Sequence, residues 1–181
     1  MIFGLFSKRA RAPDPVEALF ARVAEASRQP WLYSRAGIPD SFEGRFESLA
    51  LHAFIVLRRL RELPAPAGDV AQEFVDACFA YLELGFRQAG VSDIGVPKKM
   101  KKIAQGFYGR VQAYDAALDA DPDGRTGLVE ALRRNAAPGE GAVALADYVV
   151  SAGRAFAGRD LEAILGEAAP FPALARGEPE P

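Results

Sequence analysis

The sequence predicts an all-α protein, a single compact domain of about six to seven helices without a sheet. Apolar residues recur at steps of three and four along several segments, which is the period of a helix with one buried face. Capping residues, prolines and glycines stand at the ends of these segments, and no segment alternates between apolar and polar residues as a strand does. Half of the 181 residues are hydrophobic, which is enough for one core. We expect the domain over residues 14–166, between a short hydrophobic and basic segment (1–13) and a disordered tail rich in Pro, Gly and Glu (167–181).

The first two helices are expected to begin at aspartates. Asp14 followed by Pro15 is a typical start, because the carboxylate caps the first turn and proline lacks an N–H that this turn does not use. This helix should run to about residue 28. Asp40, with Glu43 three residues later, predicts a capping box for a second helix that ends before Pro64. A wide apolar face makes this second helix the central one: Phe42, Phe46, Leu49, Leu51, Ala53, Ile55, Leu57, Leu60 and Leu63.

The third and fourth helices carry clear apolar stripes. Asp69, with Gln72, predicts the start of the third helix, and Gly90 predicts its end. Its stripe is Phe74, Cys78, Tyr81, Leu82 and Gly85. After a connector over residues 91–96, Pro97 predicts the start of the fourth helix. The stripe of this helix is Met100, Ile103, Phe107, Val111, Tyr114 and Leu118.

The remaining elements are shorter. Residues 121–127 are rich in Asp, Pro and Gly and predict a loop. A short helix is expected over residues 128–135, a break over 138–141 and a helix over 142–157. Asp160 predicts the cap of a last short helix over residues 161–165.

Composition and motifs argue against several classes of protein. The net charge is only −2, so any site for nucleic acid must be local, and DNA is not expected as a partner. One cysteine and one histidine cannot build a zinc or helical di-iron site, and His52, within an apolar helical run, is interpreted as structural. No phosphate-binding loop, dinucleotide fingerprint or nucleophile elbow occurs. We therefore expect no catalytic residue, no metal and no cofactor, and no enzyme.

A lysine cluster is the strongest functional signal. Four cations gather at the start of the predicted fourth helix: Lys98, Lys99, Lys101 and Lys102. No acidic residue occurs between Asp93 and Asp115, and the helix dipole disfavours each cation in the first turn by roughly 0.3–1 kcal/mol. Because local rules are usually broken at functional sites, the cluster predicts an electrostatic binding role. A solvated lysine face screened by salt is the alternative.

Further candidates lie beside this cluster and at a second site. Asp93 is either a binding residue or a turn residue of the connector, and Arg110 follows on the same helix. Tyr108 points away from the apolar stripe between two glycines, which indicates either close helix packing or a shallow site. A candidate secondary basic patch consists of Arg58, Arg59 and Arg61. These arginines end the second helix, where cations are favoured, so a structural explanation suffices unless the two clusters meet in space.

Five blocks of the sequence, in this order, carry a family resemblance: DSFE at 40–43, LRRLR at 57–61, GVSDIGVPKKMK at 90–101, FYGR at 107–110 with YD at 114–115, and ALRRN at 131–135. Together they resemble the ubiquinol–cytochrome c chaperone family. The resemblance implies an all-helical fold and a role in assembling the ubiquinol–cytochrome c reductase complex on newly made cytochrome b. Some members work near the ribosome exit, and mitochondrial relatives bind a small helical partner.

The expected function is therefore a non-catalytic assembly chaperone that binds newly made cytochrome b. The expected binding residues are Asp93, Lys98, Lys99, Lys101, Lys102, Tyr108 and Arg110. We expect the protein in the cytoplasm, where it can lie at the inner face of the membrane, and residues 1–13 either fray or touch the lipid interface. Two alternatives remain: a helical module that binds anionic membrane or RNA through the lysines, and a helical enzyme with a small substrate.

Overall fold

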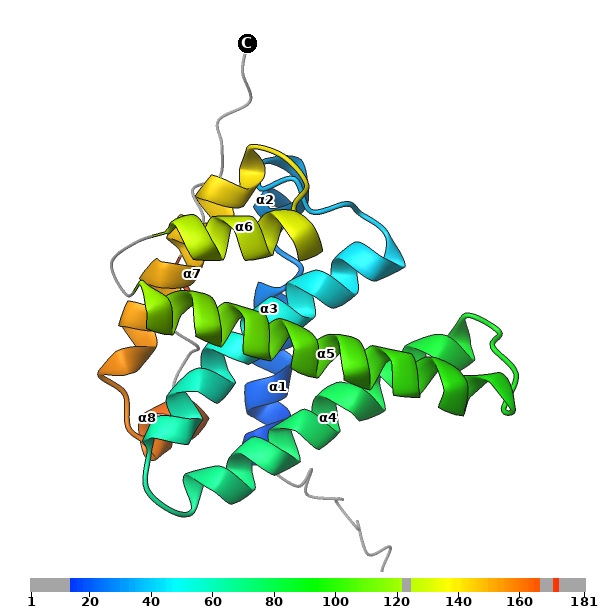
Figure 1. Ribbon diagram of the computed structural model, residues 1–181. Coiled ribbons are helices and arrows are strands. Elements are labelled where there is room, and N and C mark those ends of the chain that lie inside the picture. The colour runs from blue at the N-terminus through cyan, green and yellow to red at the C-terminus, as the bar shows by residue number, and fades with distance from the viewer. Residues whose placement is uncertain (1–13, 122–124, 167–170, 173–181) are drawn as a thin grey trace, which may run out of the picture.

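The computed structural model describes residues 14–121, 125–166 and 171–172, and all regular structure within them is helical (Figure 1). The helices are α1 (Pro15–Ala26), α2 (Pro30–Ser34), α3 (Phe42–Glu62), α4 (Ala67–Gln88), α5 (Gly95–Ala120), α6 (Thr126–Asn135), α7 (Gly141–Ala157) and α8 (Leu161–Gly166). The predicted all-α fold without a sheet is confirmed. Every predicted helix is present, and the five-residue α2 is an additional one that the sequence analysis missed.

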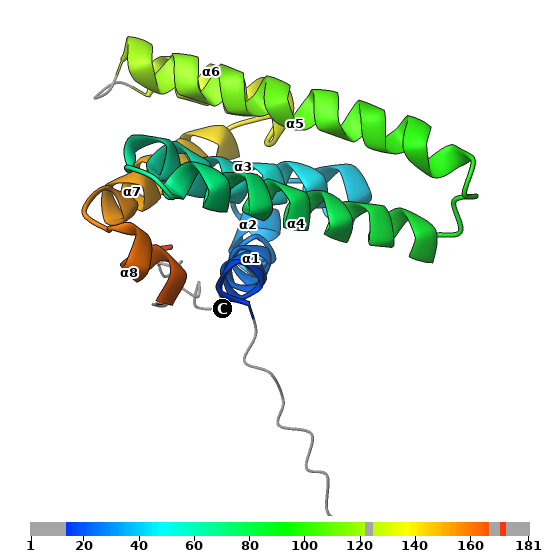
Figure 2. The ribbon, with the colours of Figure 1, turned by 90° about the horizontal axis from the view of Figure 1, so that it is seen from below.

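The helices form three layers. Figure 2 shows α5 and α6 on one side, α3, α4 and α7 in the middle, and α1, α2 and α8 on the other side. The central position predicted for α3 is confirmed, because it contacts α1, α4, α5 and α7 and most of its residues are buried. Its first apolar residue is an exception: Phe42 is 40% exposed, because it lies at the end of the helix.

Several of the predicted helix starts are wrong in detail, among them those of α3 and α4. Ser41, not Asp40, caps α3: its side chain accepts from the Gly44 amide at 3.1 Å, while Asp40 pairs with Arg45. Both residues are good caps, and only the extended backbone of Ser41 places its oxygen correctly.

The helix α4 begins at Ala67, two residues before the predicted cap Asp69. Pro64 and Pro66 supply the carbonyls of the first turn, which accept from the amides of Ala67 and Val70 at 3.1 and 3.2 Å. The helix therefore starts directly after the second proline. Asp69 lies inside the first turn, where a carboxylate complements the helix dipole. Asp14 and Asp160 do cap α1 and α8, as predicted.

The hairpin of α4 and α5 projects beyond the other helices (Figures 1 and 2). Gly90 ends α4 as predicted: with φ of +78° it allows the amide of Val91 to donate to the carbonyl of Phe86 at 3.1 Å, a Schellman motif. The helix α5 starts at Gly95, two residues before Pro97, because the amides of Gly95 and Val96 both donate to the carbonyl of Ser92. Proline is tolerated at the third position because the first four amides of a helix have no partner within it.

His52 is fully buried in the core, as expected for a structural histidine. Its Nδ1 donates to the carbonyl of Ser48 at 2.7 Å, so its Nε2 accepts from the hydroxyl of Tyr148 at 2.8 Å. Burial lowers the pKa of His52 to about 4. The ring of Phe171, from the predicted tail, packs against His52 at 5.0 Å between centroids, a contact that sequence analysis did not expect.

Two absences apply to the described residues only. No helix among them is long and apolar enough to cross a membrane. No group of three or more His, Cys, Asp or Glu side chains within the same ranges could hold a metal ion. The segment 1–13 and the tail residues 167–170 and 173–181 lie outside the described residues.

Candidate functional site

The structure places the four predicted lysines together on the projecting end of α5. All four side chains are exposed: Lys98, Lys99, Lys101 and Lys102. None forms an ion pair with another residue of the described part of the chain. Their charges are therefore available to a partner.

The energetic cost of the cluster has a different origin from the predicted one. Because α5 begins at Gly95, Lys98 occupies its fourth position and the other lysines follow in the second turn and beyond. The dipole effect fades within the first turn. Like charges three and four residues apart remain, such as Lys98 with Lys102, and each such pair costs roughly 0.2–0.5 kcal/mol. The cluster still opposes local stability, but through mutual repulsion.

A groove of about 220 Å³ lies next to this end of the hairpin, between α1, α3 and α4, and Arg28, Arg45 and Gln88 line it together with apolar side chains. Three exposed apolar side chains line it: Phe42 at 40%, Tyr81 at 37% and Leu84 at 52% exposure. Gly85 also lines it, and a Cβ added there would meet no atom within 4 Å. We call it the client groove below, after the client that the sequence analysis expects. It offers apolar contact to a partner segment.

The client groove and the lysines are joined by a row of stacked groups. The ring of Phe42 packs against that of Phe86 at 4.8 Å between centroids. The Nζ of Lys99 lies over the Phe86 ring, 5.4 Å from its centroid, within range of a cation–π interaction. Apolar and cationic surface are therefore continuous.

Sequence reasoning missed the client groove. It assigned Phe42 and Tyr81 to the core and did not use Leu84. Leu84 lies off the stripe that contains Leu82 and Phe86, and a large apolar side chain outside the buried face was the available signal.

Comparison with known proteins identifies the family of this chain. The model of the ubiquinol–cytochrome C chaperone family matches residues 34–171, most of the chain. The chain belongs to the ubiquinol–cytochrome c chaperone family. A crystal structure of the Cbp3 homolog from Brucella abortus is similar to it, with 35% sequence identity and a TM-score of 0.76. That match covers 88% of this chain and 91% of the other. The search of curated proteins finds no match.

The family match spans the lysines and the client groove, apart from the groove residues that precede position 34: Ala24, Ser27, Arg28 and Tyr33. It also reaches Phe171, whose ring packs against Phe156 and His52. The family resemblance expected from the sequence blocks is confirmed.

Three other residues predicted for binding have different surroundings in this family member. Asp93 is exposed but paired with Arg87, which also binds Glu83. Tyr108 is 51% exposed, with its ring 6.2 Å from that of Phe79. The glycines beside Tyr108 differ: Gly106 packs close to Phe46 and Gly109 faces open space.

Arg110 is held within the fold. Its guanidinium binds both oxygens of Glu47, donates to the carbonyl of Gly106 at 3.3 Å and lies 5.7 Å from the ring centroid of Phe46. The side chain is 27% exposed and that of Glu47 only 9%. The structure thus gives Arg110 a role in joining α5 to α3.

The predicted secondary patch of the chaperone does not meet the lysines. Arg58 pairs with Asp115 and Asp119, and Arg61 with Asp115. Asp115 is thirteen residues beyond Lys102 on α5, which separates the clusters by roughly 20 Å along the helix. Arg59 pairs with Glu62.

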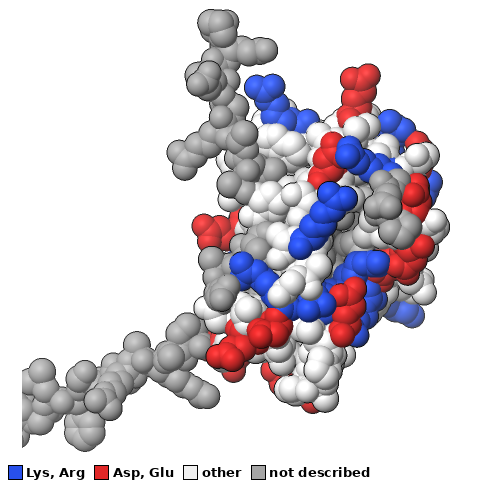
Figure 3. Space-filling model, turned by 90° about the vertical axis from the view of Figure 1, so that its left-hand side faces the viewer, with Lys and Arg blue, Asp and Glu red and all other residues white. Residues whose placement is uncertain are grey.

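The surface on the side of α7 and α8 mixes positive and negative groups, with an uncharged area beside them (Figure 3). Arg58 and Arg61 are likewise neutralised by a neighbouring carboxylate, that of Asp115. The lysines of α5 differ in that no acidic partner compensates them among the described residues.

The two groups that sequence analysis considered for chemistry are unsuited to it. Cys78 is buried, and burial raises the pKa of its thiol to about 12, so little thiolate forms near neutral pH. His52 is buried with both ring nitrogens engaged. Neither side chain is exposed to a substrate.

Proposed function

We propose that this chaperone binds newly made cytochrome b without catalysing a reaction, and so promotes assembly of the ubiquinol–cytochrome c reductase complex. The observation that carries the proposal is the continuity of the client groove with the four lysines through Phe42, Phe86 and Lys99. The family assignment indicates which complex is assembled, the ubiquinol–cytochrome c reductase complex. Cytochrome b, a membrane subunit of that complex, is the client that such a surface suits.

The surface suits a membrane protein before assembly. A newly made membrane subunit presents apolar helices joined by polar loops. Exposed Phe42, Tyr81 and Leu84 can cover apolar side chains of such a helix. Lysines at the rim can hold acidic loops, and charged rims favour fast and specific association.

The same lysines also indicate where in the cell the protein acts. A cluster of four lysines near anionic lipid contributes about 1 kcal/mol per cation to binding. We propose that the protein works in the cytoplasm at the inner face of the membrane, where it can meet the client near the ribosome. Direct binding to lipid or RNA without the client is the competing function. A small helical partner subunit is a further candidate for the same surface.

A photo-crosslinking experiment tests the proposal. A photoreactive amino acid replaces Leu84 in the client groove, and, as the matched control, Val143 on α7, an apolar side chain that is 45% exposed. After irradiation of cells that synthesise the complex, cytochrome b is expected as an adduct of position 84 and not of position 143. Adducts of cytochrome b at both positions in equal amount, or at neither in a variant that restores the complex, would contradict the proposal. Adducts only with lipid or RNA would establish the competing function.

A further inference from the structure

The connection between α4 and α5 lies at the free end of the projecting hairpin (Figures 1 and 2). We call residues 89–97, which make this connection, the hairpin tip. Asp93 is the only charged residue among them, and its carboxylate is paired with Arg87. The hairpin tip therefore presents little unpaired charge to a partner.

Ile94 stands out within the hairpin tip. At 93% exposure it is the most exposed large apolar side chain of the described residues, so it contributes almost nothing to the core. It also stands directly before α5, where polar capping residues are favoured and isoleucine is not, and no side-chain cap forms there. Because Ile94 serves neither packing nor capping, it indicates a contact with something outside the chain.

The four lysines follow Ile94 at a short distance. At 1.5 Å per residue, Lys98 lies roughly 6 Å and Lys102 roughly 12 Å from Ile94 along α5. Apolar side chains of amphipathic segments at a membrane surface lie about 5–10 Å within the boundary of headgroups and acyl chains. With Ile94 at that depth, the lysines are level with the headgroups. Their side chains span roughly 160° around the helix, which suits an approach by the end of the hairpin.

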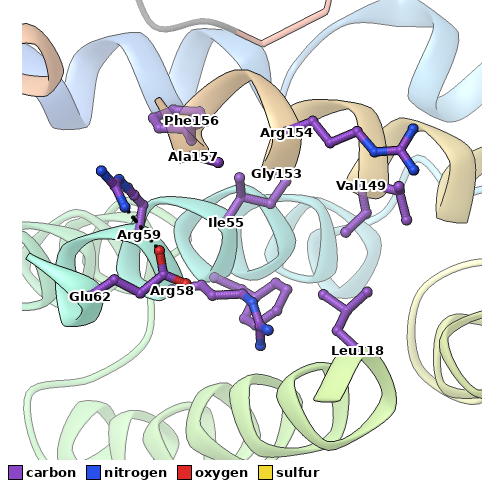
Figure 4. A pocket seen from close by; sticks show the side chains of 12 residues that line it. Ile55, Arg58, Arg59, Glu62, Leu118, Val149, Gly153, Arg154, Phe156 and Ala157 are labelled. Carbon is purple, nitrogen blue, oxygen red and sulfur yellow. Dashed lines mark hydrogen bonds and ion pairs between the residues drawn. The ribbon is translucent and has the colours of Figure 1, made fainter. Parts of the chain in front are cut away.

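The hollow between α3, α5 and α7, of about 370 Å³, lacks this combination (Figure 4). The apolar side chains of Ile55 and Phe156 are only 3% and 1% exposed there. Two of the three arginines at its rim, Arg58 and Arg59, are paired with carboxylates. Exposed apolar surface beside a cluster of unpaired cations is thus a property of the hairpin tip and not of this hollow.

We propose that the hairpin tip docks this protein on an anionic lipid surface, with Ile94 inserted between the headgroups and the four lysines bound to lipid phosphates. An apolar group together with a basic cluster supplies the two signals that stable attachment to a membrane needs. RNA is a poorer match, because its bases stack on aromatic or guanidinium groups and an aliphatic side chain offers no such plane.

Docking by the hairpin tip brings the client groove to the membrane. Leu84 lines the groove and lies roughly 6 Å along α4 from the last residue of that helix, Gln88. The groove therefore opens close to the lipid surface, where a membrane subunit enters the bilayer. This consequence rests on the proposed function, whereas the docking itself does not.

Co-sedimentation of the full chain with vesicles tests the docking. Vesicles of phosphatidylcholine and phosphatidylglycerol in equal parts should bind it at least roughly tenfold more tightly than phosphatidylcholine alone, since each lysine contributes about fivefold. Ile94→Ser should weaken binding to the anionic vesicles roughly tenfold, because the burial of isoleucine is lost. Val143→Ser on α7, the matched control, removes another exposed apolar side chain and should bind like the unchanged chain. Thermal unfolding of each variant verifies that it is folded.

A fluorescent label reports the insertion directly. Cys78 is buried, so an environment-sensitive dye attaches to the new thiol of Ile94→Cys or of Val143→Cys. With anionic vesicles, emission from position 94 should shift to the blue and emission from position 143 should not. The proposal is overturned if the vesicles do not bind, if Ile94→Ser binds as well as Val143→Ser, or if the label at position 94 stays in water. Binding to polyuridylate RNA but not to the vesicles would overturn it as well.

Failure of the docking can be told apart from failure of the proposed function, because the vesicles contain no client. If the vesicles do not bind while cytochrome b still forms an adduct at position 84, the docking alone is excluded. If the vesicles bind as predicted and no such adduct forms, the proposed client alone is excluded and the docking is supported.

Discussion

Arg110 of α5 donates three hydrogen bonds to the carboxylate of Glu47 of α3: Nε to Oε2 at 2.9 Å and to Oε1 at 3.1 Å, and Nη2 to Oε1 at 2.5 Å. The side chain of Glu47 is nearly buried, so water cannot take the place of Arg110 as its partner without a loss of stability. The pair fixes the base of the projecting hairpin to the central helix.

Arg110→Met should lower the free energy of unfolding by about 1–3 kcal/mol, because it leaves the carboxylate of Glu47 buried and unpaired. Arg45→Met is the matched control, since Arg45 binds Asp40 on the exposed surface. That change should cost much less, because an ion pair that lies fully in water contributes little to stability. Urea unfolding measures the free energy of unfolding of both variants. Equal losses would show that the buried pair contributes no more to stability than the exposed one.

Reversal of the lysine charges should separate binding from folding. With Lys98, Lys99, Lys101 and Lys102 changed to Glu, far-UV circular dichroism should show unchanged helicity, because these side chains are exposed and unpaired. Association with cytochrome b should fall at least roughly tenfold, since rim charges steer and orient binding. The same four residues changed to Arg keep the charge and should retain association. If the Glu variant associates fully with cytochrome b at physiological salt, the lysines are not part of the binding site.

Filling the client groove should raise stability and lower function together. Gly85→Leu puts a side chain into open space within a helix, and the gain in helix propensity is about 0.8–1 kcal/mol. The same side chain occupies the groove, so co-purification of cytochrome b should decline. Gly68→Leu lies in open space outside the groove and should leave co-purification unchanged. If cytochrome b still co-purifies with the Gly85→Leu variant in the same amount, the groove is not the binding site.

The stability of the fold should depend on the protonation of His52. Burial lowers its pKa to about 4 in the folded chain, against a usual value near 6.5. As the pH falls below 6.5, the unfolded chain binds a proton that the folded chain does not, so stability is lost between pH 6.5 and 4. The loss from pH 7 to 5 should be about 2 kcal/mol from this group.

His52 is the only histidine, so its ring signal can be followed by NMR without assignment of others. The signal should not titrate above pH 5 in the folded protein. A midpoint near 6.5 would mean that the ring is accessible to water.

Much of the fold followed from local pattern. The stripes of α3 and α5 report which face of each helix is apolar, and Gly90 marked a real Schellman motif. The cap of α3 was misplaced because Asp40 and Ser41 are both good caps and only the backbone decides between them. The five-residue α2 is too short for periodicity to show.

The site was less accessible to sequence reasoning. The lysines were found because their spacing is local, whereas the client groove joins Phe42 to Leu84, forty-two residues apart. Periodicity shows that a side chain is apolar but not whether another helix covers it. The pairing of Arg110 with Glu47 likewise depends on a contact between separate helices.

The central claim is tested most directly in a strain that lacks this gene. The measurement is the amount of spectral cytochrome b and of assembled ubiquinol–cytochrome c reductase in its membranes, with the cytochrome b transcript followed alongside. We predict loss of both with a normal transcript, restored by the unchanged gene and not by the variant with four glutamates. An unchanged amount of assembled complex in the deletion strain would contradict the account.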